Sequence, residues 1–462
     1  MSVIKAYTLP HPPLAVPAVG RGKESKEIRD TLNAMDSVAQ EIARIAPETI
    51  IYITPHSTVY SDYFHISAGA AASGDLGRFG APEVEFNINY DTELIDEISR
   101  VAEQNAVAAG TLGEKDTKLD HGFTVPMWFI NNHYKDYRAI RVSQSGMASA
   151  EHYLMGQIIA KSAAQIGRKT VVIASSDLSH RLKEDAPYSF APEGAQFDSL
   201  ITESLEKADF LSLLRIPGKI RERAGECGYN SLVMLAGIFD KQDVEAKLLS
   251  YEGPFGVGYA VASFSSLGKN EDRNILEKYI DDILSETENR KNLEDEYQKL
   301  ARESLELAIR NDEIMPIPNG LPSSMLSDRA GTFVSIHKNG QLRGCIGTIA
   351  PTTKCIASEI IQNAVSAGLS DERFSPVAVE ELPFLVYKVD VLSAPEPILS
   401  VEELDVTRYG VIVSCGNRRG LLLPNLDGID TVEEQVAIAR RKGGISEGEK
   451  VKLQRFEVIR HG

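Results

Sequence analysis

The fold of this chain is decided by the stretch Thr49-Ile-Ile-Tyr-Ile-Thr-Pro-His-Ser57. Its apolar residues follow one another almost without a break, which is typical of a strand buried on both faces of a sheet. Val3–Leu9 and Thr170–Ser175 have the same character, and residues 26–46 carry apolar side chains at helical spacing. This alternation of strands and helices predicts an α/β domain with a central, mostly parallel or mixed sheet flanked by helices.

A histidine follows each of these three predicted strands. His11 lies in Leu9-Pro-His-Pro12, His56 belongs to the stretch quoted above, and His180 lies in Ser175-Ser-Asp-Leu-Ser-His180. A fourth, His121, lies in Leu119-Asp-His-Gly122. Ligands of such sheets bind beyond the carboxyl ends of the strands, and the flanking prolines fix the backbone so that a side chain keeps a set direction. The pattern favours a metal site at the strand ends over a set of unrelated structural histidines.

The segment Ala224-Gly-Glu-Cys-Gly-Tyr229, at the start of a predicted helix, contains two further potential metal ligands, Glu226 and Cys227. A carboxylate or a thiolate is favoured at this position by the helix dipole. Two histidines and one carboxylate leave open positions for substrate and O2 on Fe(II), as in the non-haem oxygenases, and the same set suits catalytic zinc. A thiolate in third place would favour softer metals such as copper(I) or zinc.

Four segments occur in a characteristic order: Leu9-Pro-His-Pro12, Pro55-His-Ser57, Asp120-His-Gly-Phe-Thr-Val-Pro126 and Ser176-Asp-Leu-Ser-His180. In these segments residues 1–268 resemble the LigB-type class III extradiol dioxygenase superfamily, which also contains the Memo proteins. The resemblance implies that His11 and His56 bind the metal, with Fe(II) favoured and zinc or copper as alternatives. It implies a third ligand from the Gly-Glu-Cys-Gly segment. Glu226 suits the dioxygenases and is favoured, while Cys227 falls where Memo-type proteins carry a cysteine.

The resemblance also implies roles for the other residues. His180 resembles the catalytic acid/base of the family, and His121 resembles the histidine that hydrogen-bonds bound O2 or substrate. Asp120 and Asp177 would orient these rings by accepting an N–H. The implied function is cleavage of an aromatic vicinal diol with O2. The alternatives are a Memo-like metal-binding or redox-regulatory protein without ring cleavage, and a zinc-dependent hydrolase that uses a metal-bound water.

The second half of the chain has a different character. Residues 269–294 are rich in charge but keep apolar residues at helical spacing, which predicts a charged helical connector. Residues 295–462 mix hairpin and helix patterns, which predicts an α+β domain. The segment Gln341-Leu-Arg-Gly-Cys-Ile-Gly-Thr348 resembles the AMMECR-type domain. Members of that family tend to be encoded beside radical-SAM proteins, so the resemblance implies a functional association with such a protein.

Arg343, Gly344 and Cys345 form a candidate site in this second domain. A cysteine needs a base or a positive neighbour to become a reactive thiolate. With a two-residue turn at Asn339-Gly340, Cys345 opposes Val334 and points to the face opposite His337. A bulge at Gly344 would change this register. We therefore expect a structural or binding role for Cys345.

The composition limits the classes of partner. The formal net charge is −17, from 66 acidic and 49 basic residues, and such a field repels nucleic acid and anionic membrane surfaces. No apolar stretch approaches the roughly 20 residues of a membrane span, and the first residues lack the pattern of a secretory signal. The four cysteines have no CxxC spacing. We expect a cytoplasmic protein that acts on a small molecule, and a homo-oligomer is compatible with the sequence.

Overall fold

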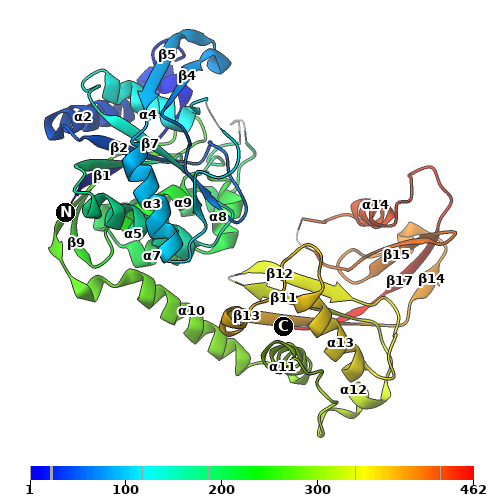
Figure 1. Cartoon of the computed structure of the whole chain (residues 1–462). Coiled ribbons are helices and arrows are strands. Elements are labelled where there is room, and N and C mark those ends of the chain that lie inside the picture. The colour runs from blue at the N-terminus through cyan, green and yellow to red at the C-terminus, as the bar shows by residue number, and fades with distance from the viewer. Residues whose placement is uncertain (1, 21–23, 116–117, 185–187, 339, 427) are drawn as a thin grey trace. The chain divides into compact units, whose positions relative to one another are not determined.

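The computed structural model describes residues 2–20, 24–115, 118–184, 188–338, 340–426 and 428–462. The chain divides into two compact units, Met1–Asp281 and Asp282–Gly462, called here the N-terminal and the C-terminal unit. The N-terminal unit is α/β and the C-terminal unit is α+β, so the predicted fold classes are confirmed (Figure 1).

The N-terminal unit is built on a mixed six-stranded sheet in the order β7-β2-β8-β1-β10-β9. The first four of these strands are parallel to one another. The strand β10 is antiparallel to β1, and β9 is antiparallel to β10. The strands of this sheet are β1 (Val3–Leu9), β2 (Thr49–Thr54), β7 (Arg138–Ser143), β8 (Thr170–Ser175), β9 (Gln242–Glu252) and β10 (Tyr259–Lys269). Since β2, β8 and β1 are neighbours, their carboxyl ends lie side by side at one edge of the sheet.

Helices cover both faces of this sheet. The helices of the unit are α1 (Glu24–Glu27), α2 (Arg29–Ile45), α3 (Thr92–Gln104), α4 (His121–Asn131), α5 (Ser149–Gln165), α6 (Pro192–Lys207), α7 (Phe210–Leu214), α8 (Gly218–Ala224) and α9 (Tyr229–Ile238). On one face of the sheet α2 packs on α4, and on the opposite face α5 packs on α9. Every residue of β2 and of β8 is buried between these layers, as the unbroken apolar runs predict.

A hairpin projects from this α/β layer. It consists of β4 (Ala71–Leu76), the short 3₁₀ turn η2 (Gly77–Phe79) and β5 (Ala81–Asn89). The hairpin is joined to the loop before α4 by a bridge between Ser73 and Lys118. It therefore lies beside the segment that carries His121. The small β3 (Phe64–His65) and β6 (Ala109–Gly110) pair with each other.

The helix α10 (Ile275–Lys291) lies where the sequence predicts the charged helical connector. The C-terminal unit then has two four-stranded sheets, ordered β12-β11-β13-β18 and β14-β17-β15-β16. Its helices are α11 (Glu296–Asn311), α12 (Ser323–Ser327), α13 (Ile356–Leu369) and α14 (Val432–Lys442). Its strands are β11 (Thr332–Lys338), β12 (Gln341–Gly347), β13 (Leu385–Leu392), β14 (Glu396–Ile398), β15 (Gly410–Cys415), β16 (Arg418–Leu422), β17 (Lys452–Phe456) and β18 (Val458–His461). The helices α11 and α13 pack on the first sheet and α14 packs on the second.

The register of β11 and β12 differs from the prediction. Ile336 pairs with Gly344 and His337 pairs with Leu342, so Arg343 is an extra residue in a bulge. Cys345 consequently opposes Ser335, and not Val334. Because Ser335 and His337 share a face, Cys345 points to the same face as His337, and the prediction of opposite faces is wrong. Asn339 of the predicted turn lies outside the described residues.

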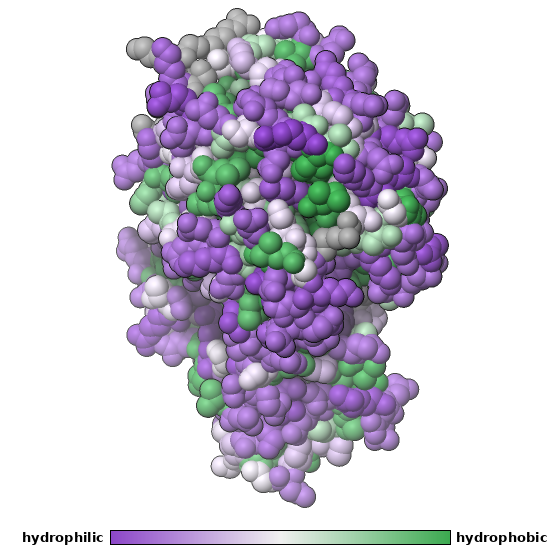
Figure 2. Space-filling view, turned by 90° about the vertical axis from the view of Figure 1, so that its left-hand side faces the viewer, coloured by the Kyte–Doolittle hydropathy of each residue, from purple (hydrophilic) through white to green (hydrophobic). Residues whose placement is uncertain are grey.

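One face of the molecule shows the character of the surface (Figure 2). Figure 2 shows one face of the molecule, on which hydrophilic side chains predominate and apolar ones form small separate groups. None of the helices in the described ranges combines the length and the apolar character that crossing a bilayer requires.

Candidate metal centre

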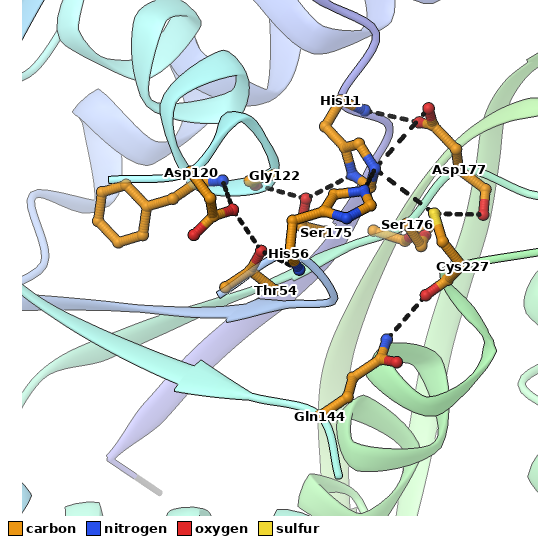
Figure 3. A network of polar contacts seen from close by, with 12 residues as sticks. His11, Thr54, His56, Asp120, Gly122, Gln144, Ser175, Ser176, Asp177 and Cys227 are labelled. Carbon is orange, nitrogen blue, oxygen red and sulfur yellow. Dashed lines mark hydrogen bonds and ion pairs between the residues drawn. The ribbon is translucent and has the colours of Figure 1, made fainter. Parts of the chain in front are cut away.

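Three potential metal ligands meet beyond the carboxyl ends of the sheet (Figure 3). His11 follows β1, His56 follows β2, and Cys227 lies two residues before α9. The Nε2 atoms of His11 and His56 are 3.0 Å apart, and the Sγ of Cys227 is 3.5 Å from Nε2 of His11. All three donor atoms lie within 4.8 Å of one another. Nitrogen donors at about 2.0–2.1 Å and sulfur at about 2.3 Å from one ion are themselves about 3–3.6 Å apart, and the two separations from Nε2 of His11 lie in this range. The three residues are therefore a candidate ligand set for one cation.

The chain fixes the tautomer of His11. The hydroxyl of Ser175 donates its proton to the carbonyl of Gly122, and its oxygen lies 2.8 Å from Nδ1 of His11. Since the Ser175 proton is already used, Nδ1 of His11 is the donor in this contact, and Nε2 keeps its lone pair. Burial lowers the pKa of His11 well below its ordinary value, and the nearby histidines His56, His121 and His180 lower it further. The ring is therefore neutral and ready to bind a cation.

Glu226 is not among the donors that the structure brings together. Its Oε2 accepts the backbone N–H of Tyr229 at 2.6 Å, at the start of α9. Burial raises its pKa to about 7, against the effect of that hydrogen bond. A carboxylate at this position satisfies a free N–H group of the helix N-terminus, and among the described residues the donor group of His11 and His56 is completed by Cys227. The structure thus favours Cys227, the alternative that the sequence left in second place.

Close packing sets the position of Cys227. Gly228 lies against β8, and a Cβ atom there would come within 2.2 Å of the Cβ of Ser176 and 2.8 Å of the carbonyl of Asp177. The carbonyl of Cys227 accepts a hydrogen bond from Nε2 of Gln144 at 2.9 Å. Burial, with the negative charges of Asp177 and Glu226, raises the pKa of the Cys227 thiol well above its ordinary value. A bound cation would lower the pKa of the Cys227 thiol again, because the cation takes the place of the thiol proton.

His121 lies directly beside these donors. Its ring is stacked on that of His56, with centroids 4.2 Å apart, and it contacts His11 edge-on at 5.3 Å. Burial lowers its pKa to about 3, and the charges of His56 and Arg78 act in the same direction. The ring is a neutral hydrogen-bonding group at the edge of the centre. As the first residue of α4 it is held by the helix that Asp120 caps.

His180 lies close enough to His11 and His56 for their charges to interact. Its backbone N–H donates to the carbonyl of Ala224, which ties it to the segment that carries Cys227. Its ring contacts Tyr188 edge-on, with centroids 5.2 Å apart. Burial lowers the pKa of His180, although the Leu178 backbone opposes this effect. The ring is therefore neutral at neutral pH, and its nitrogen lone pair is free to accept a proton from a bound hydroxyl group.

The two aspartates do not contact the rings that they were expected to orient. Asp120 accepts from the hydroxyl of Thr54 at 2.6 Å and from the N–H of Phe123 at 3.1 Å, and it pairs with Arg141 at 3.3 Å. It thus joins β2 to the N-terminus of α4 and positions His56 and His121 only through the backbone.

Asp177 contacts His11, and not the ring of His180 that it was expected to orient. Its Oδ1 accepts the backbone N–H of His11 at 2.7 Å, and its Oδ2 lies 3.8 Å from Nε2 of His11. Burial raises its pKa to about 7, against the effect of the His11 N–H. The residue that holds the His180 loop is Asp198, which accepts from the N–H of Ser179 at 2.8 Å and from Tyr251 at 2.7 Å.

Sequence reasoning missed Asp198, Gln144 and Ser175 as supporting residues. Ser175 lies in the segment Ser175-Ser-Asp-Leu-Ser-His180 quoted for His180 and could have been found there. Asp198 lies within α6 and Gln144 follows β7, and neither stands in a pattern that indicates a site.

In the C-terminal unit, the three candidate residues have separate environments. The guanidinium of Arg343 pairs with Glu381 at 2.8 Å, and Gly344 packs so closely on α13 that a Cβ would meet the carbonyl of Ala367 at 2.1 Å. The thiol of Cys345 accepts from the hydroxyl of Ser335 at 3.2 Å, and its carbonyl accepts from Arg373 at 3.1 Å. Arg343 and Gly344 therefore hold β12 in place, and only Cys345 presents a reactive group.

Known proteins resemble both parts of the chain. The sequence model for the catalytic LigB subunit of aromatic ring-opening dioxygenase matches residues 5–262, and that for AMMECR1 matches residues 298–461. A Clostridium acetobutylicum protein is 40% identical over 470 residues, which cover 100% of this chain and 99% of that protein. A Thermotoga maritima protein is 47% identical over 167 residues, which cover 36% of this chain and 96% of that protein.

Two solved structures are also similar. An uncharacterized protein from Pyrococcus horikoshii shares 30% sequence identity with a TM-score of 0.33, over 36% of this chain and 88% of that one. An uncharacterized protein from Escherichia coli K12 shares 14% identity with a TM-score of 0.39, over 56% of this chain and 99% of that one.

Proposed function

The chain belongs to the family of the catalytic LigB subunit of aromatic ring-opening dioxygenases, and we propose that its N-terminal unit is a metal-dependent oxidoreductase that opens an aromatic vicinal diol with O2. The ring carbon bond beside the diol breaks, and both atoms of O2 enter the product. The metal, Fe(II) in this proposal, would be held by His11, His56 and Cys227. The observation that carries the proposal is the convergence of these three donor atoms within 4.8 Å of one another.

When bound, Fe(II) supplies coordination positions for the diol and O2, together with a path for electrons between them. The surrounding imidazoles supply the proton chemistry. A vicinal diol must lose hydroxyl protons to react, and a neutral ring nitrogen of His180 can accept one of them. The lowered pKa of His180 keeps that nitrogen free of a proton at neutral pH. The same imidazolium can return the proton to the product.

His121 has a different part in this proposal. Its pKa of about 3 excludes a role as a cation at neutral pH, so it acts as a neutral hydrogen-bonding group. Its ring is stacked on that of His56, a potential metal ligand, with the two centroids 4.2 Å apart, and this stacking sets the orientation of the His121 ring. His121 would therefore orient a substrate oxygen beside the metal.

A second candidate function is favoured by one observation, the thiol of Cys227. The ferrous oxygenases are associated with two histidines and one carboxylate, whereas a thiolate favours softer metals such as copper(I) or zinc. A metal-binding or redox-regulatory protein without ring cleavage would need these three donors but no acid/base imidazole. The presence of His180 and His121 beside the donors supports the oxidoreductase.

The test is anaerobic loading of the full chain with Fe(II), followed by measurement of O2 uptake with a panel of catechols. We expect uptake in proportion to ring-opened product, and no uptake by His11→Ala or His56→Ala protein. Full loading with one Fe(II) per chain but no uptake with any diol would contradict the oxidoreductase and favour the second candidate. Parallel loading with zinc and copper(I) would then show which metal the donors prefer.

A further inference from the structure

The first sheet of the C-terminal unit carries a row of polar side chains on one face. Ser335 of β11 pairs with Cys345 of β12 on one side and with Lys388 of β13 on the other. Paired residues point to the same face of a sheet, so these three side chains lie next to one another. The helices α11 and α13 pack on the opposite face, against Val334 and Ile336 (Figure 1). We call the face with the polar row the open face.

The bulge at Arg343 puts the thiol of Cys345 on the open face. Gly344 packs closely on α13, and Cys345, the next residue along the strand, points away from that helix. The backbone of Cys345 is held on both sides, because its N–H donates to Asp371 at 2.9 Å and its carbonyl accepts from Arg373 at 3.1 Å. The thiol is thus fixed in position and only half-buried.

Two hydrogen-bond donors lie beside the sulfur of Cys345. The hydroxyl of Ser335 donates to Sγ at 3.2 Å. Hydrogen bonds to Asp371 raise the pKa of Arg373, and the charge of Cys345 and a hydrogen bond to its side chain raise it further, so the guanidinium also lies beside the sulfur. The thiolate is the nucleophilic form of a cysteine, and donors and positive neighbours favour it over the thiol. The surroundings of Cys345 are therefore those of a reactive sulfur.

Cys415, the other half-buried cysteine of this unit, has a different environment. Its Sγ donates to the carboxylate of Glu449 at 3.6 Å. Arg418 lies 3.8 Å from the same sulfur, but its charge is paired with that carboxylate. A carboxylate beside a sulfur disfavours the negative thiolate. Cys415 is therefore an internal comparison for Cys345.

Arg373 also keeps hydrogen-bonding capacity for a ligand. Its Nε and Nη2 donate to Asp371, and Nη2 also reaches the carbonyl of Cys345. Among the described residues Nη1 has no hydrogen-bond partner. The side chain of Arg373 is 58% exposed, so a small molecule can approach this nitrogen from solvent. A sulfur, a hydroxyl and a free guanidinium nitrogen thus lie together at the surface of the sheet.

We propose that Cys345 is a peroxide-reactive thiol, which a hydroperoxide oxidises to a sulfenic acid beside Ser335 and Arg373. The thiolate Sγ attacks the hydroxyl oxygen of the hydroperoxide, the S–O bond forms as the O–O bond breaks, and the sulfur loses two electrons. The hydroperoxide is reduced to an alcohol, or to water in the case of hydrogen peroxide, and its departing oxygen takes a proton from solvent. Negative charge moves from the sulfur to that oxygen, and the guanidinium of Arg373 stabilises it in both places.

The return to the thiol requires a second thiol. The other cysteines of this unit are not on the open face, since Cys355 precedes α13 and Cys415 belongs to β15 in the second sheet. A low-molecular-weight thiol therefore attacks the sulfenic sulfur with loss of water, and a second one releases Cys345 and leaves as part of a disulfide. This inference concerns the C-terminal unit alone and does not depend on the proposed function.

The test uses the full chain supplied with zinc, which has no redox chemistry of its own. Hydrogen peroxide or cumene hydroperoxide is added in the presence of dimedone, which traps sulfenic acid, and peptide mass spectrometry follows each cysteine separately. We expect Cys345 to be trapped about tenfold or more faster than Cys415, because a hydrogen bond to a charged group contributes about that factor. Alkylation by iodoacetamide, measured in parallel, reports the general reactivity of each thiol.

The variants assign the reactivity to the two donors. Ser335→Ala and Arg373→Gln should each slow trapping at Cys345 by about tenfold or more, whereas Ser335→Thr keeps the hydroxyl and should keep the rate. Arg418→Gln is the matched control, because Arg418 lies beside Cys415 and its loss should leave the Cys345 rate unchanged. Thermal unfolding of each variant is measured as well, and Ser335→Ala, which removes one oxygen atom, carries the test if Arg373→Gln unfolds.

Three results would overturn the proposal. The first is trapping of Cys345 and Cys415 at equal rates. The second is an unchanged Cys345 rate in folded Ser335→Ala or Arg373→Gln protein. The third is fast alkylation of Cys345 by iodoacetamide without faster trapping after peroxide, which would indicate a nucleophilic thiol that does not reduce hydroperoxides.

Discussion

The hydroxyl oxygen of Ser175 lies 2.8 Å from Nδ1 of His11, and its proton is directed to the carbonyl of Gly122. This short chain of contacts holds the His11 ring with its Nε2 lone pair facing Nε2 of His56 at 3.0 Å. The arrangement of the candidate ligands thus depends on a serine that is not itself one of the three donors.

We predict that Ser175→Ala weakens metal binding by about 10–100-fold, the usual effect of removing the group that orients a ligating histidine. Titration of the apo-protein with zinc against a competing chelator measures this. Ser176→Ala is the control, because the Ser176 hydroxyl contacts that of Thr8 at 2.6 Å and no metal donor. An equal loss of affinity in both variants would mean that packing at the end of β8, and not the His11 tautomer, is responsible.

A second prediction concerns His180. If it moves a proton, His180→Gln should lower kcat by about 10²–10⁴-fold and leave the Fe(II) content unchanged. The pH profile of kcat should also lose its acidic limb, which lies below the ordinary histidine value because burial lowers the pKa of His180. Loss of Fe(II) from this variant would instead indicate that His180 supports the metal centre.

Much of the N-terminal site could be predicted from the sequence, because His11 and His56 directly follow strands whose ends are neighbours in any such sheet. The choice of Glu226 or Cys227 as the third candidate ligand could not be predicted from the sequence. Adjacent residues at a helix entry point in different directions, and which of them faces the cation depends on how closely Gly228 packs on Ser176. That contact joins residues far apart in the chain and leaves no local pattern.

Two further features were beyond sequence reasoning for similar reasons. The alternation of side chains along a strand predicts the face of Cys345 only if the pairing is regular, and the bulge at Arg343 breaks it. The position of Arg78 near His121 depends on how the β4-β5 hairpin lies next to the loop before α4, and no motif in the hairpin encodes that long-range contact.

The close approach of Gly228 to β8 leads to a third prediction. In Gly228→Ala, the new methyl group would meet the Cβ of Ser176 at 2.2 Å, so the start of α9 must move. We expect a loss of about 1–3 kcal/mol in the free energy of unfolding, as for other overpacked sites, together with weaker metal binding. Gly448→Ala is the control, since a Cβ there meets no atom within 4 Å. Unchanged stability of Gly228→Ala would contradict the packing described here.

A fourth prediction concerns the acid sensitivity of the C-terminal unit. Burial opposes ionisation of Glu381, but hydrogen bonds from Arg343, the Ala378 N–H and Lys338 outweigh it and lower its pKa from 4.5 to about 2. A lowered carboxyl pKa contributes stability that is fully present above the unfolded value of 4.5 and is lost as the pH falls toward 2. The contribution is of the order of 1–3 kcal/mol, as for hydrogen bonds to charged groups.

Hydrogen exchange of peptides from β12 measures this in the full chain. The difference in protection between wild type and Glu381→Gln should be largest above about pH 5 and should shrink as the pH falls to about 3. Glu402→Gln, at an exposed position, is the control and should show no difference at any pH. A difference between wild type and Glu381→Gln that does not change with pH would contradict the role given to the ion pair with Arg343.

We propose that one cation is held by two imidazoles and the thiolate of Cys227, and X-ray absorption of the metal-loaded protein tests this ligand set most directly. We predict one sulfur at about 2.3 Å and two imidazole nitrogens at about 2.0–2.1 Å from the metal. The sulfur should disappear in Cys227→Ser and remain in Glu226→Gln, whose amide oxygen can still accept the Tyr229 N–H. A spectrum with only oxygen and nitrogen ligands in the wild-type protein, or a changed first coordination sphere in Glu226→Gln, would contradict the account.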